Sequence, residues 1–277
     1  MIIDILSDLH FDYYFKQFNN SKIDVKKVYD KYFLQDGRAA GDILVVAGDL
    51  GHYNNQNFIL LKIIKKIYGY KAIVCVLGNH DYYLNGLVAR DEYENSFLRA
   101  RELIDLINTE DNLYCLDGNV VEIDGVKFGG AMGWYSDAYL KYKYPFGNFP
   151  LKSNNEMWKN CMPDFKMTEG LVNFDDLYHS ELPKIEAVYR ECDVMITHVN
   201  PSFKDEHLSQ EFLGQQTNTF YCFNGHKFLR GTTAKHWIFG HTHDSFSYEF
   251  SGVGCHVNAY SDKKAVMKSI ELIKDKS

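Results

Sequence analysis

The sequence of 277 residues contains no long apolar run, no dense run of basic residues and no closely spaced cysteines. A membrane-crossing helix needs about 20 mostly apolar residues, so the sequence predicts none. The N-terminus, Met1-Ile2-Ile3-Asp4, lacks the basic region of a signal peptide, which favours a cytoplasmic protein. The six cysteines stand singly, without C-x-x-C spacing, so we expect reduced thiols rather than a disulfide framework.

The charge distribution argues against tight binding to long nucleic acids. The formal net charge is −7, and lysine and arginine do not cluster in the sequence. Proteins that hold a duplex through its phosphates usually show a basic stripe. A small anionic substrate held through metal ions is compatible with this charge. No pattern in the sequence indicates an oligomeric state.

The composition predicts one large folded domain over residues 1–277. Hydrophobic residues make up 45% of the chain and aromatic residues 15%, enough for a sizeable core. Residues 134–180 differ from the rest, because they are aromatic, rich in asparagine, weakly periodic and interrupted by Pro145, Pro150 and Pro163. We interpret them as an irregular excursion that forms a lid or faces the substrate, with an ordinary packed connection as the alternative.

Alternating patterns predict an α/β fold with a largely parallel sheet. Short apolar runs typical of buried strands cover residues 2–6, 43–47, 72–77, 194–197 and 237–239. Helical periodicity covers residues 58–67, closed by Gly69, and also residues 97–107 and 182–189. Residues 120–128 resemble a hairpin that turns at Asp124-Gly125, which predicts a second sheet.

Each apolar run is followed by side chains that can bind metal ions. They are Asp8 and His10, then Asp49, then Asn79, His80 and Asp81, then His198, and finally His241 and His243. Loops beyond the carboxyl ends of parallel strands converge on one crevice, so five such loops in series predict one site. On extended backbone, residues two apart face the same side, which would pair Asp8 with His10 and His241 with His243. Oxygen and imidazole ligands without cysteine suit manganese, iron or zinc.

The remaining histidines and the nearby aromatic residues have simpler interpretations. Five histidines fit no motif and are expected to be surface or structural residues, with His207 a secondary candidate near the site: His179, His207, His226, His236 and His256. Four aromatic residues close to the motifs could stack on a nucleobase, but core packing is the default: Tyr82, Tyr83, Trp134 and Tyr135.

In order along the chain, D-x-H, G-D, G-N-H-D, a histidine after a strand and G-H-T-H resemble the calcineurin-like metallophosphoesterase superfamily. The resemblance implies a sandwich of two sheets flanked by helices, a four-layer αββα fold. It implies a first metal ion on Asp8, His10, Asp49 and His243. It implies a second ion on Asp49, Asn79, His198 and His241, with Asp49 as the bridge. Residues 120–134 and 237–258 further resemble bacterial and phage phosphohydrolases with a V-x-I-D-G-V-x-F hairpin.

The resemblance also implies a mechanism. Two ions about 3.5–4 Å apart can polarise a phosphoryl group and hold a bridging hydroxide that attacks it. His80 would contact the phosphate and protonate the leaving group, with Asp81 orienting its ring. Protein phosphatases of the superfamily carry an aspartate three positions after the bridging one, but this chain has His52 there. G-D-L-G-H instead resembles the G-D-x-x-H of double-strand-break repair nucleases and other phosphodiesterases, so His52 is expected to contact the phosphate.

The sequence therefore predicts a dinuclear phosphoesterase that hydrolyses mono- or diesters of small molecules or nucleotides. Manganese is the first expectation for the metal, with iron, zinc or nickel as alternatives. A nuclease acting on DNA or RNA is a second hypothesis, supported by His52 and opposed by the acidic charge. A non-catalytic, metal-bound scaffold is a third, and the intact His80 argues against it.

Overall fold

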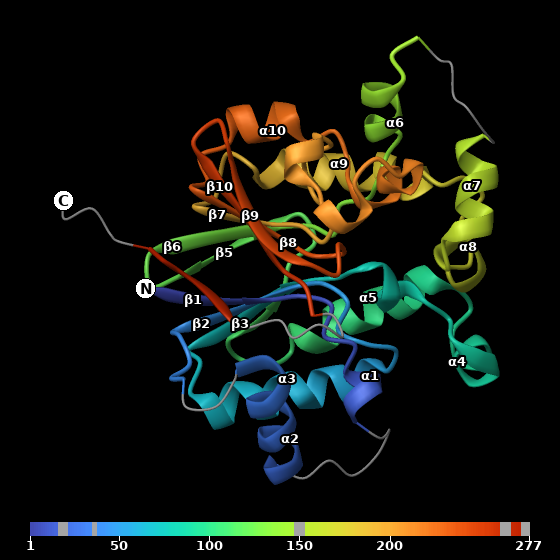
Figure 1. Ribbon diagram of the computed structural model, residues 1–277. Coiled ribbons are helices and arrows are strands. Elements are labelled where there is room, and N and C mark those ends of the chain that lie inside the picture. Colours follow the sequence, from blue (N-terminus) through green and yellow to red (C-terminus); the bar gives the residue numbers. More distant parts are fainter. Residues whose placement is uncertain (16–21, 35–37, 147–152, 261–266, 273–277) are drawn as a thin grey trace.

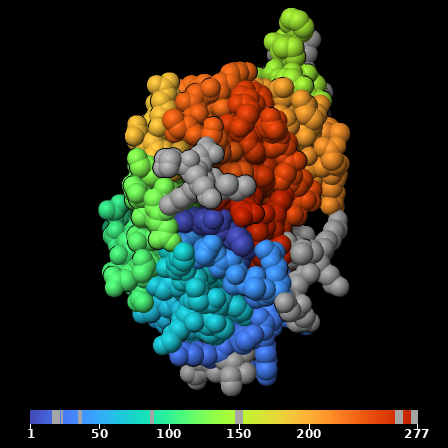
Figure 2. All heavy atoms as spheres, turned by 90° about the vertical axis from the view of Figure 1, so that its left-hand side faces the viewer, coloured from blue at the N-terminus to red at the C-terminus, as the bar shows by residue number. Residues whose placement is uncertain are grey.

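The computed structural model describes residues 1–15, 22–34, 38–146, 153–260 and 267–272. Two β-sheets lie face to face, and helices cover the outer face of each (Figure 1). The N-terminal part of the chain, blue to cyan, forms one side of the sandwich, and the C-terminal part, orange to red, forms much of the other (Figure 2). The predicted two-sheet sandwich is confirmed.

The first sheet has the strand order β11-β1-β2-β3-β4. Its strands are β1 (Ile2–Leu6), β2 (Ile43–Ala47), β3 (Ala72–Val76), β4 (Leu113–Cys115) and β11 (Lys268–Glu271). Strands β1 to β4 are parallel, and β11 pairs antiparallel with β1 at the edge. Every residue of β2 and β3 is buried, as expected for parallel strands covered on both faces.

The second sheet has the strand order β5-β6-β7-β8-β10-β9. Its strands are β5 (Asn119–Ile123), β6 (Val126–Gly130), β7 (Val194–Ile196), β8 (His236–Phe239), β9 (Ser245–Phe250) and β10 (Val253–Asn258). The predicted hairpin is β5–β6, and its turn residues Asp124 and Gly125 both have positive φ, 51° and 74°. Two such residues define the turn whose twist matches paired strands.

The helices lie outside the two sheets (Figure 1). They are α1 (Phe11–Tyr14), α2 (Lys22–Tyr29), α3 (Asn54–Tyr68), α4 (Gly86–Glu92), α5 (Ser96–Ile107), α6 (Ala138–Lys143), α7 (Asn154–Cys161), α8 (Asp164–Met167), α9 (Asp176–Val188) and α10 (His226–Gly231). Helix α3 ends as predicted, because Gly69 has φ 70° and donates to the carbonyl of Lys65 at 3.0 Å. Helix α5 begins after Asn95, whose side chain accepts from two backbone N–H groups.

The strands divide their side chains between two cores. Along β2, Ile43, Val45 and Ala47 belong to the core between the sheets, whereas Leu44 and Val46 face the helices. This alternation follows from the two-residue period of a strand. Because both faces are buried, the register of β2 is fixed, and so is the position of the loop that follows it.

Residues 134–180 contain α6, α7, α8 and the first turns of α9, and residues 147–152 of this segment lie outside the described residues. Helix α7 begins with a capping box, in which the backbone N–H groups of Ser153 and Glu156 each donate to the other residue's side chain. Trp134, Tyr135 and Trp158 are buried in the core, at most 1% exposed. Part of this segment therefore packs into the interior.

Candidate metal centre

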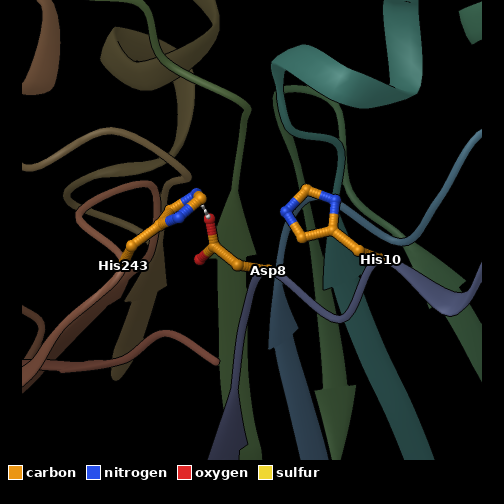
Figure 3. Close-up of side chains that lie close together, drawn as sticks. All are labelled: Asp8, His10 and His243. Carbon is orange, nitrogen blue, oxygen red and sulfur yellow. Dashed lines mark ion pairs between the residues drawn. The ribbon is translucent and has the colours of Figure 1, made fainter. Parts of the chain in front are cut away.

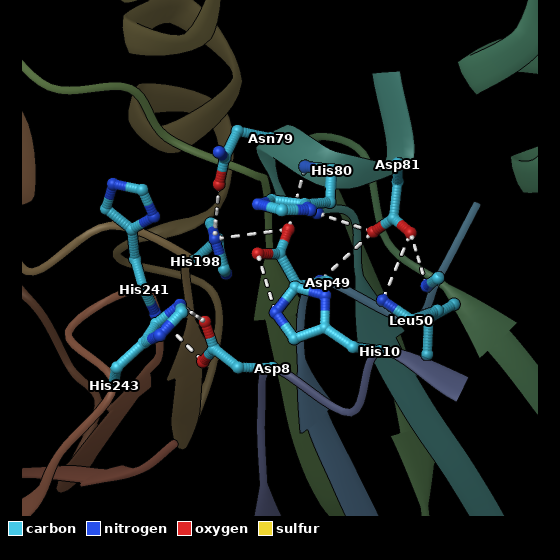
Figure 4. A network of polar contacts seen from close by, with 12 residues as sticks. Asp8, His10, Asp49, Leu50, Asn79, His80, Asp81, His198, His241 and His243 are labelled. Carbon is cyan, nitrogen blue, oxygen red and sulfur yellow. Dashed lines mark hydrogen bonds and ion pairs between the residues drawn. The ribbon is translucent and has the colours of Figure 1, made fainter. Parts of the chain in front are cut away.

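The five predicted loops meet at one end of the sandwich. Asp8 and His10 follow β1, Asp49 follows β2, Asn79 and His80 follow β3, His198 follows β7, and His241 and His243 follow β8. Their side chains point toward one another across the gap between the sheets (Figure 4). The convergence arises because these strands are parallel within each sheet.

Backbone conformation sets this site apart. Among the described residues, eight non-glycine residues have positive φ, and five of them are predicted ligands: Asp8, His10, Asp49, His241 and His243. The left-handed conformation costs an L-residue about 1–2 kcal/mol, so the surrounding structure must impose it. Asp8 and His10 share a face through left-handed turns with φ of 55° and 42°. The prediction of extended backbone at D-x-H was therefore wrong, although Asp8 and His10 do lie in one group of possible ligands.

One group of donors comprises Asp8, His10 and His243, whose ligand atoms lie within 4.8 Å of one another (Figure 3). His243 Nε2 lies 3.5 Å from Asp8 Oδ1. The other oxygen of Asp8 accepts the backbone N–H of His241 at 3.0 Å, which fixes the carboxylate. Asp8 Oδ1 is buried and has no hydrogen-bond partner among the described residues.

A second group comprises Asp49, His198 and His241, also within 4.8 Å. His198 Nε2 lies 3.4 Å from Asp49 Oδ1 and 3.0 Å from Asn79 Oδ1. Asp49 forms a further group with His10 and His80, so its carboxylate lies between the two sides of the site. Figure 4 shows Asp49 at the centre of the network.

Two backbone carbonyls fix the protonation of the histidine rings. His198 Nδ1 donates to the carbonyl of Ala47 at 2.7 Å, and His241 Nε2 donates to the carbonyl of Phe220 at 2.9 Å. In the neutral ring of His241 the other nitrogen then carries a lone pair. Burial disfavours the charged ring of His198, but Asp49 raises its pKa to about 9, so in the metal-free protein Nε2 carries a proton that a metal ion would displace. Metal-binding histidines are commonly oriented in this way.

The electrostatics of the site fit a cation. Burial favours the neutral form of Asp49, but His198 and the other imidazoles around it hold the pKa of this carboxyl well below its usual range. Burial lowers the pKa of His241 to about 3, which keeps the ring neutral. Asp49 Oδ2 and His10 Nδ1 are buried without hydrogen-bond partners within the described part of the chain. A divalent ion between Asp49 Oδ2 and His10 Nε2, which lie 3.8 Å apart, would satisfy the Asp49 oxygen, and carboxylate, amide and imidazole donors suit manganese, iron or zinc.

Two further histidines lie beside these groups. The His80 ring lies 4.5 Å from the His10 ring and 5.5 Å from the His52 ring, centroid to centroid, and it is nearly parallel to His52. His52 Nδ1 lies 2.9 Å from Asp12 Oδ2, and Asp12 Oδ1 accepts the His52 backbone N–H at 3.1 Å. Asp12 belongs to no motif, and its only sequence signal is its closeness to D-x-H.

Asp81 does not occupy its predicted position beside the His80 ring. Its carboxylate accepts four backbone N–H groups, from Asp49, Leu50, Gly51 and Gly78, at 2.8–3.3 Å. His80 Nδ1 has no hydrogen-bond partner among the described residues. The expectation that Asp81 orients His80 is therefore corrected: Asp81 holds together the two loops that carry Asp49 and Asn79.

Glycine is required where these loops approach one another. A Cβ on Gly78 would lie 2.1 Å from Asp49 Oδ1. A Cβ on Gly48, which has φ +89°, would lie 2.4 Å from His198 Nδ1. Real Cβ atoms do not approach so closely, so both positions exclude any side chain. The glycines preceding the ligands therefore have a steric role.

The other predicted residues lie in the interior. Tyr82, Tyr83, Trp134 and Tyr135 are at most 5% exposed, which favours packing over nucleobase stacking. His207 is also buried, with Nδ1 2.8 Å from Ser202 Oγ and its ring stacked on Tyr248.

A family model decides the assignment. The model for calcineurin-like phosphoesterases matches residues 1–245. The chain belongs to the calcineurin-like phosphoesterase family. This phosphoesterase is thus a metal-dependent hydrolase of phosphoric esters. No curated protein sequence matches it. Within the described ranges, no helix has the length and apolar content needed to cross a membrane.

Solved structures extend the comparison. Phosphopantetheinyl hydrolase from Mycobacterium tuberculosis has a TM-score of 0.67 and 17% identity, over 99% of this chain and 96% of that one. GAP50, the anchor in the inner membrane complex of Plasmodium, has a TM-score of 0.40 and 11% identity, covering 93% and 70%. An archaeal phosphodiesterase has a TM-score of 0.32 and 16% identity, covering 98% and 100%. The first similarity shows a shared fold over almost the whole phosphoesterase.

Proposed function

We propose that this phosphoesterase is dinuclear and hydrolyses phosphate mono- or diesters of small molecules or nucleotides. The position of Asp49 is the main support. Its carboxylate lies within reach of His10 on one side and of His198 and His241 on the other. A carboxylate placed between two donor groups can bind two ions at once. The mixed oxygen and nitrogen donors make manganese the first candidate, followed by iron, zinc and nickel.

Two divalent ions, when bound, would polarise the phosphoryl group and lower the pKa of water. His80 and His52 supply the remaining contacts. His80 Nδ1 and His52 Nε2 are buried and lack hydrogen-bond partners in the described structure, and the two rings stack beside the donor groups, which supports a role for both in binding phosphate. Burial lowers the pKa of His80 to about 3, so the ring is neutral in the free protein. An adjacent anionic phosphate favours the protonated ring, which then donates to the leaving oxygen.

We also propose a cytosolic location. Its six cysteines are free thiols, and five of them are buried. Free thiols persist in a reducing compartment.

The test is hydrolysis of p-nitrophenyl phosphate and bis-p-nitrophenyl phosphate by chelator-stripped protein, with manganese, iron, zinc, nickel or magnesium restored separately. We expect activity to return with at least one transition metal and two ions to bind per chain. Asp49→Asn should remove this activity, and His80→Ala should lower turnover while both ions still bind. Wild-type protein that hydrolyses neither ester with any metal would refute the proposal, as would full activity in Asp49→Asn.

A further inference from the structure

Asp164, the first residue of α8, is a buried carboxylate behind the metal centre. It is 0% exposed and lies 85 positions from Asn79 in the sequence. Asp164 Oδ1 accepts from Asn79 Nδ2 at 2.8 Å and from the Tyr83 hydroxyl at 2.8 Å. Asp164 Oδ2 accepts from the Tyr135 hydroxyl at 2.9 Å. None of the ion pairs found among the described residues includes Asp164.

The burial of the Asp164 carboxylate costs folding free energy. Burying an ionised carboxylate without a cation costs several kcal/mol, and well-packed apolar residues are often at least as stable. Burial raises the pKa of Asp164, while hydrogen bonds from Tyr83, Asn79 and Tyr135 oppose this rise. Stability alone therefore gives no reason for an aspartate here.

The hydrogen bonds around Asn79 show what the carboxylate does. An ionised carboxylate only accepts hydrogen bonds, so it must face the NH₂ end of an amide. The two N–H groups of Asn79 go to Asp164 Oδ1 and to the Tyr83 hydroxyl oxygen, at 2.8 and 3.0 Å. The Tyr83 proton goes to Asp164 in turn. The NH₂ end is thus saturated, and Asn79 Oδ1 points at His198 Nε2, 3.0 Å away.

We propose that Asp164 is a positioning residue that fixes the amide of Asn79 with its oxygen toward the second donor group, Asp49, His198 and His241. The proposal rests on the dinuclear function proposed above. It gives residues 134–180 a role in building the centre, because Asp164, Tyr135 and Trp158 all come from this segment. Trp158 Nε1 donates to the Tyr135 hydroxyl at 2.6 Å, which directs the Tyr135 proton to Asp164.

Asp164→Asn tests the proposal with little change in shape. The new amide can donate as well as accept, so it no longer selects the NH₂ end of Asn79. We expect the variant to keep one manganese ion per chain and to bind the second about 10- to 100-fold more weakly, the usual effect of losing a group that orients a ligand. Titration calorimetry with manganese, together with the metal content after dialysis, measures both steps.

Glu181→Gln is the matched control. Glu181 is also buried, at 1% exposure, and it accepts from the Gly133 N–H at 3.0 Å and pairs with Lys184. Its described partners include no candidate ligand, so this variant should keep both binding steps. Asn79→Ala is the reference variant. Because Asp164 is proposed to act through Asn79, the double variant Asn79→Ala/Asp164→Asn should bind the second ion no more weakly than Asn79→Ala alone. The proposal would be overturned if Asp164→Asn bound both manganese ions with wild-type affinity, or if it bound both ions equally more weakly.

A second measurement separates this inference from the dinuclear proposal. In metal-free protein, the Asn79 side-chain NH₂ gives nitrogen–proton NMR signals that can be assigned by their loss in Asn79→Ala. We expect these signals to be shifted and slowly exchanging in wild type and in Glu181→Gln, and to move toward free-amide values in Asp164→Asn. Unchanged signals in Asp164→Asn refute the positioning role whatever the number of ions. Fewer than two ions in wild type refute the dinuclear function alone.

Discussion

Asp81 and Arg99 bind the N–H and the C=O of the same residue, Gly51. Asp81 Oδ1 accepts the Gly51 N–H at 3.3 Å, and Arg99 Nη2 donates to the Gly51 carbonyl at 3.1 Å. Arg99, which is 1% exposed, also donates to the carbonyls of His80 and Tyr83. One buried anion and one buried cation therefore join the loop after β2 to the loop after β3.

Asp81→Asn should destabilise the protein strongly. An asparagine has one acceptor oxygen, so it cannot accept the four backbone N–H groups that Asp81 accepts. Unsatisfied buried donors, and the loss of the Asp81 charge that favours the buried Arg99 guanidinium, should lower the free energy of unfolding by about 3 kcal/mol. Urea unfolding of the metal-free protein measures this. Asp105→Asn, at a carboxylate 62% exposed on α5, is the control and should change stability by less than about 0.5 kcal/mol.

Gly78→Ala should remove metal binding through steric contact alone. The φ of Gly78 is −116°, an ordinary value for any residue, but the new Cβ would lie 2.1 Å from Asp49 Oδ1. The carboxylate must move, so we expect metal-restored hydrolysis to fall by at least about 100-fold, the upper effect of disturbing a ligand's support.

Gly231→Ala is the matched control for Gly78→Ala. It lies at the end of α10, where a Cβ would meet nothing closer than the Tyr189 ring at 3.3 Å. We expect near-wild-type hydrolysis and metal content. Equal activity in the two alanine variants would show that the Gly78 loop adapts and that the close approach to Asp49 has no functional importance.

The strands and their loops could be predicted because each signal is local. The apolar runs that became β1, β2, β3, β7 and β8 are short and bounded by polar residues, and the structure confirms them within one residue. Parallel strands then place their C-terminal loops together without any knowledge of side-chain contacts. This is why the candidate ligands were found, although their left-handed backbone was not expected.

The supporting residues could not be predicted because their contacts are distant in sequence. Asp164 meets Asn79 across 85 positions and Arg99 meets Gly51 across 48, and neither belongs to a periodic pattern. Asp81 was found but placed wrongly, since a carboxylate next to His80 in sequence does not reveal that it folds back onto backbone N–H groups. The short helices α6 to α8 have too few turns for periodicity to identify them.

Asp12→Asn should lower catalysis without removing the metal ions. Asp12 holds His52 through its ring and its backbone, at 2.9 and 3.1 Å. The amide still accepts one of these bonds, so we expect His52 to lose its fixed orientation and kcat/KM for bis-p-nitrophenyl phosphate to fall about 10-fold. His52→Ala should cost at least as much, and the double variant should cost no more than His52→Ala. If the losses of kcat/KM in the two single variants added up in the double variant, Asp12 would not act through His52.

Stability should fall as the pH is lowered from about 6.5 toward 4, in part because of His226. Burial, followed by nearby Arg230 and Lys204, lowers the pKa of His226 to about 4, whereas an unfolded histidine titrates near pH 6.5. Between these values the unfolded chain binds a proton that the folded chain does not, so acidification favours unfolding. The ring lies between Phe203 and Phe250, with centroids 4.1 and 4.6 Å away.

His226→Gln should reduce this pH dependence. Glutamine cannot titrate but can still bond Ser202 Oγ, which lies 2.9 Å from His226 Nε2. The measurement is urea unfolding of chelator-treated protein at pH 7.5 and pH 5, followed by circular dichroism. We expect a smaller loss of unfolding free energy in the variant than in wild type, because other histidines with a lowered pKa, such as the half-buried His256, still contribute. His179→Gln, at a side chain 73% exposed, should leave the wild-type difference intact. If His226→Gln also keeps that difference, the protonation of His226 is not coupled to unfolding.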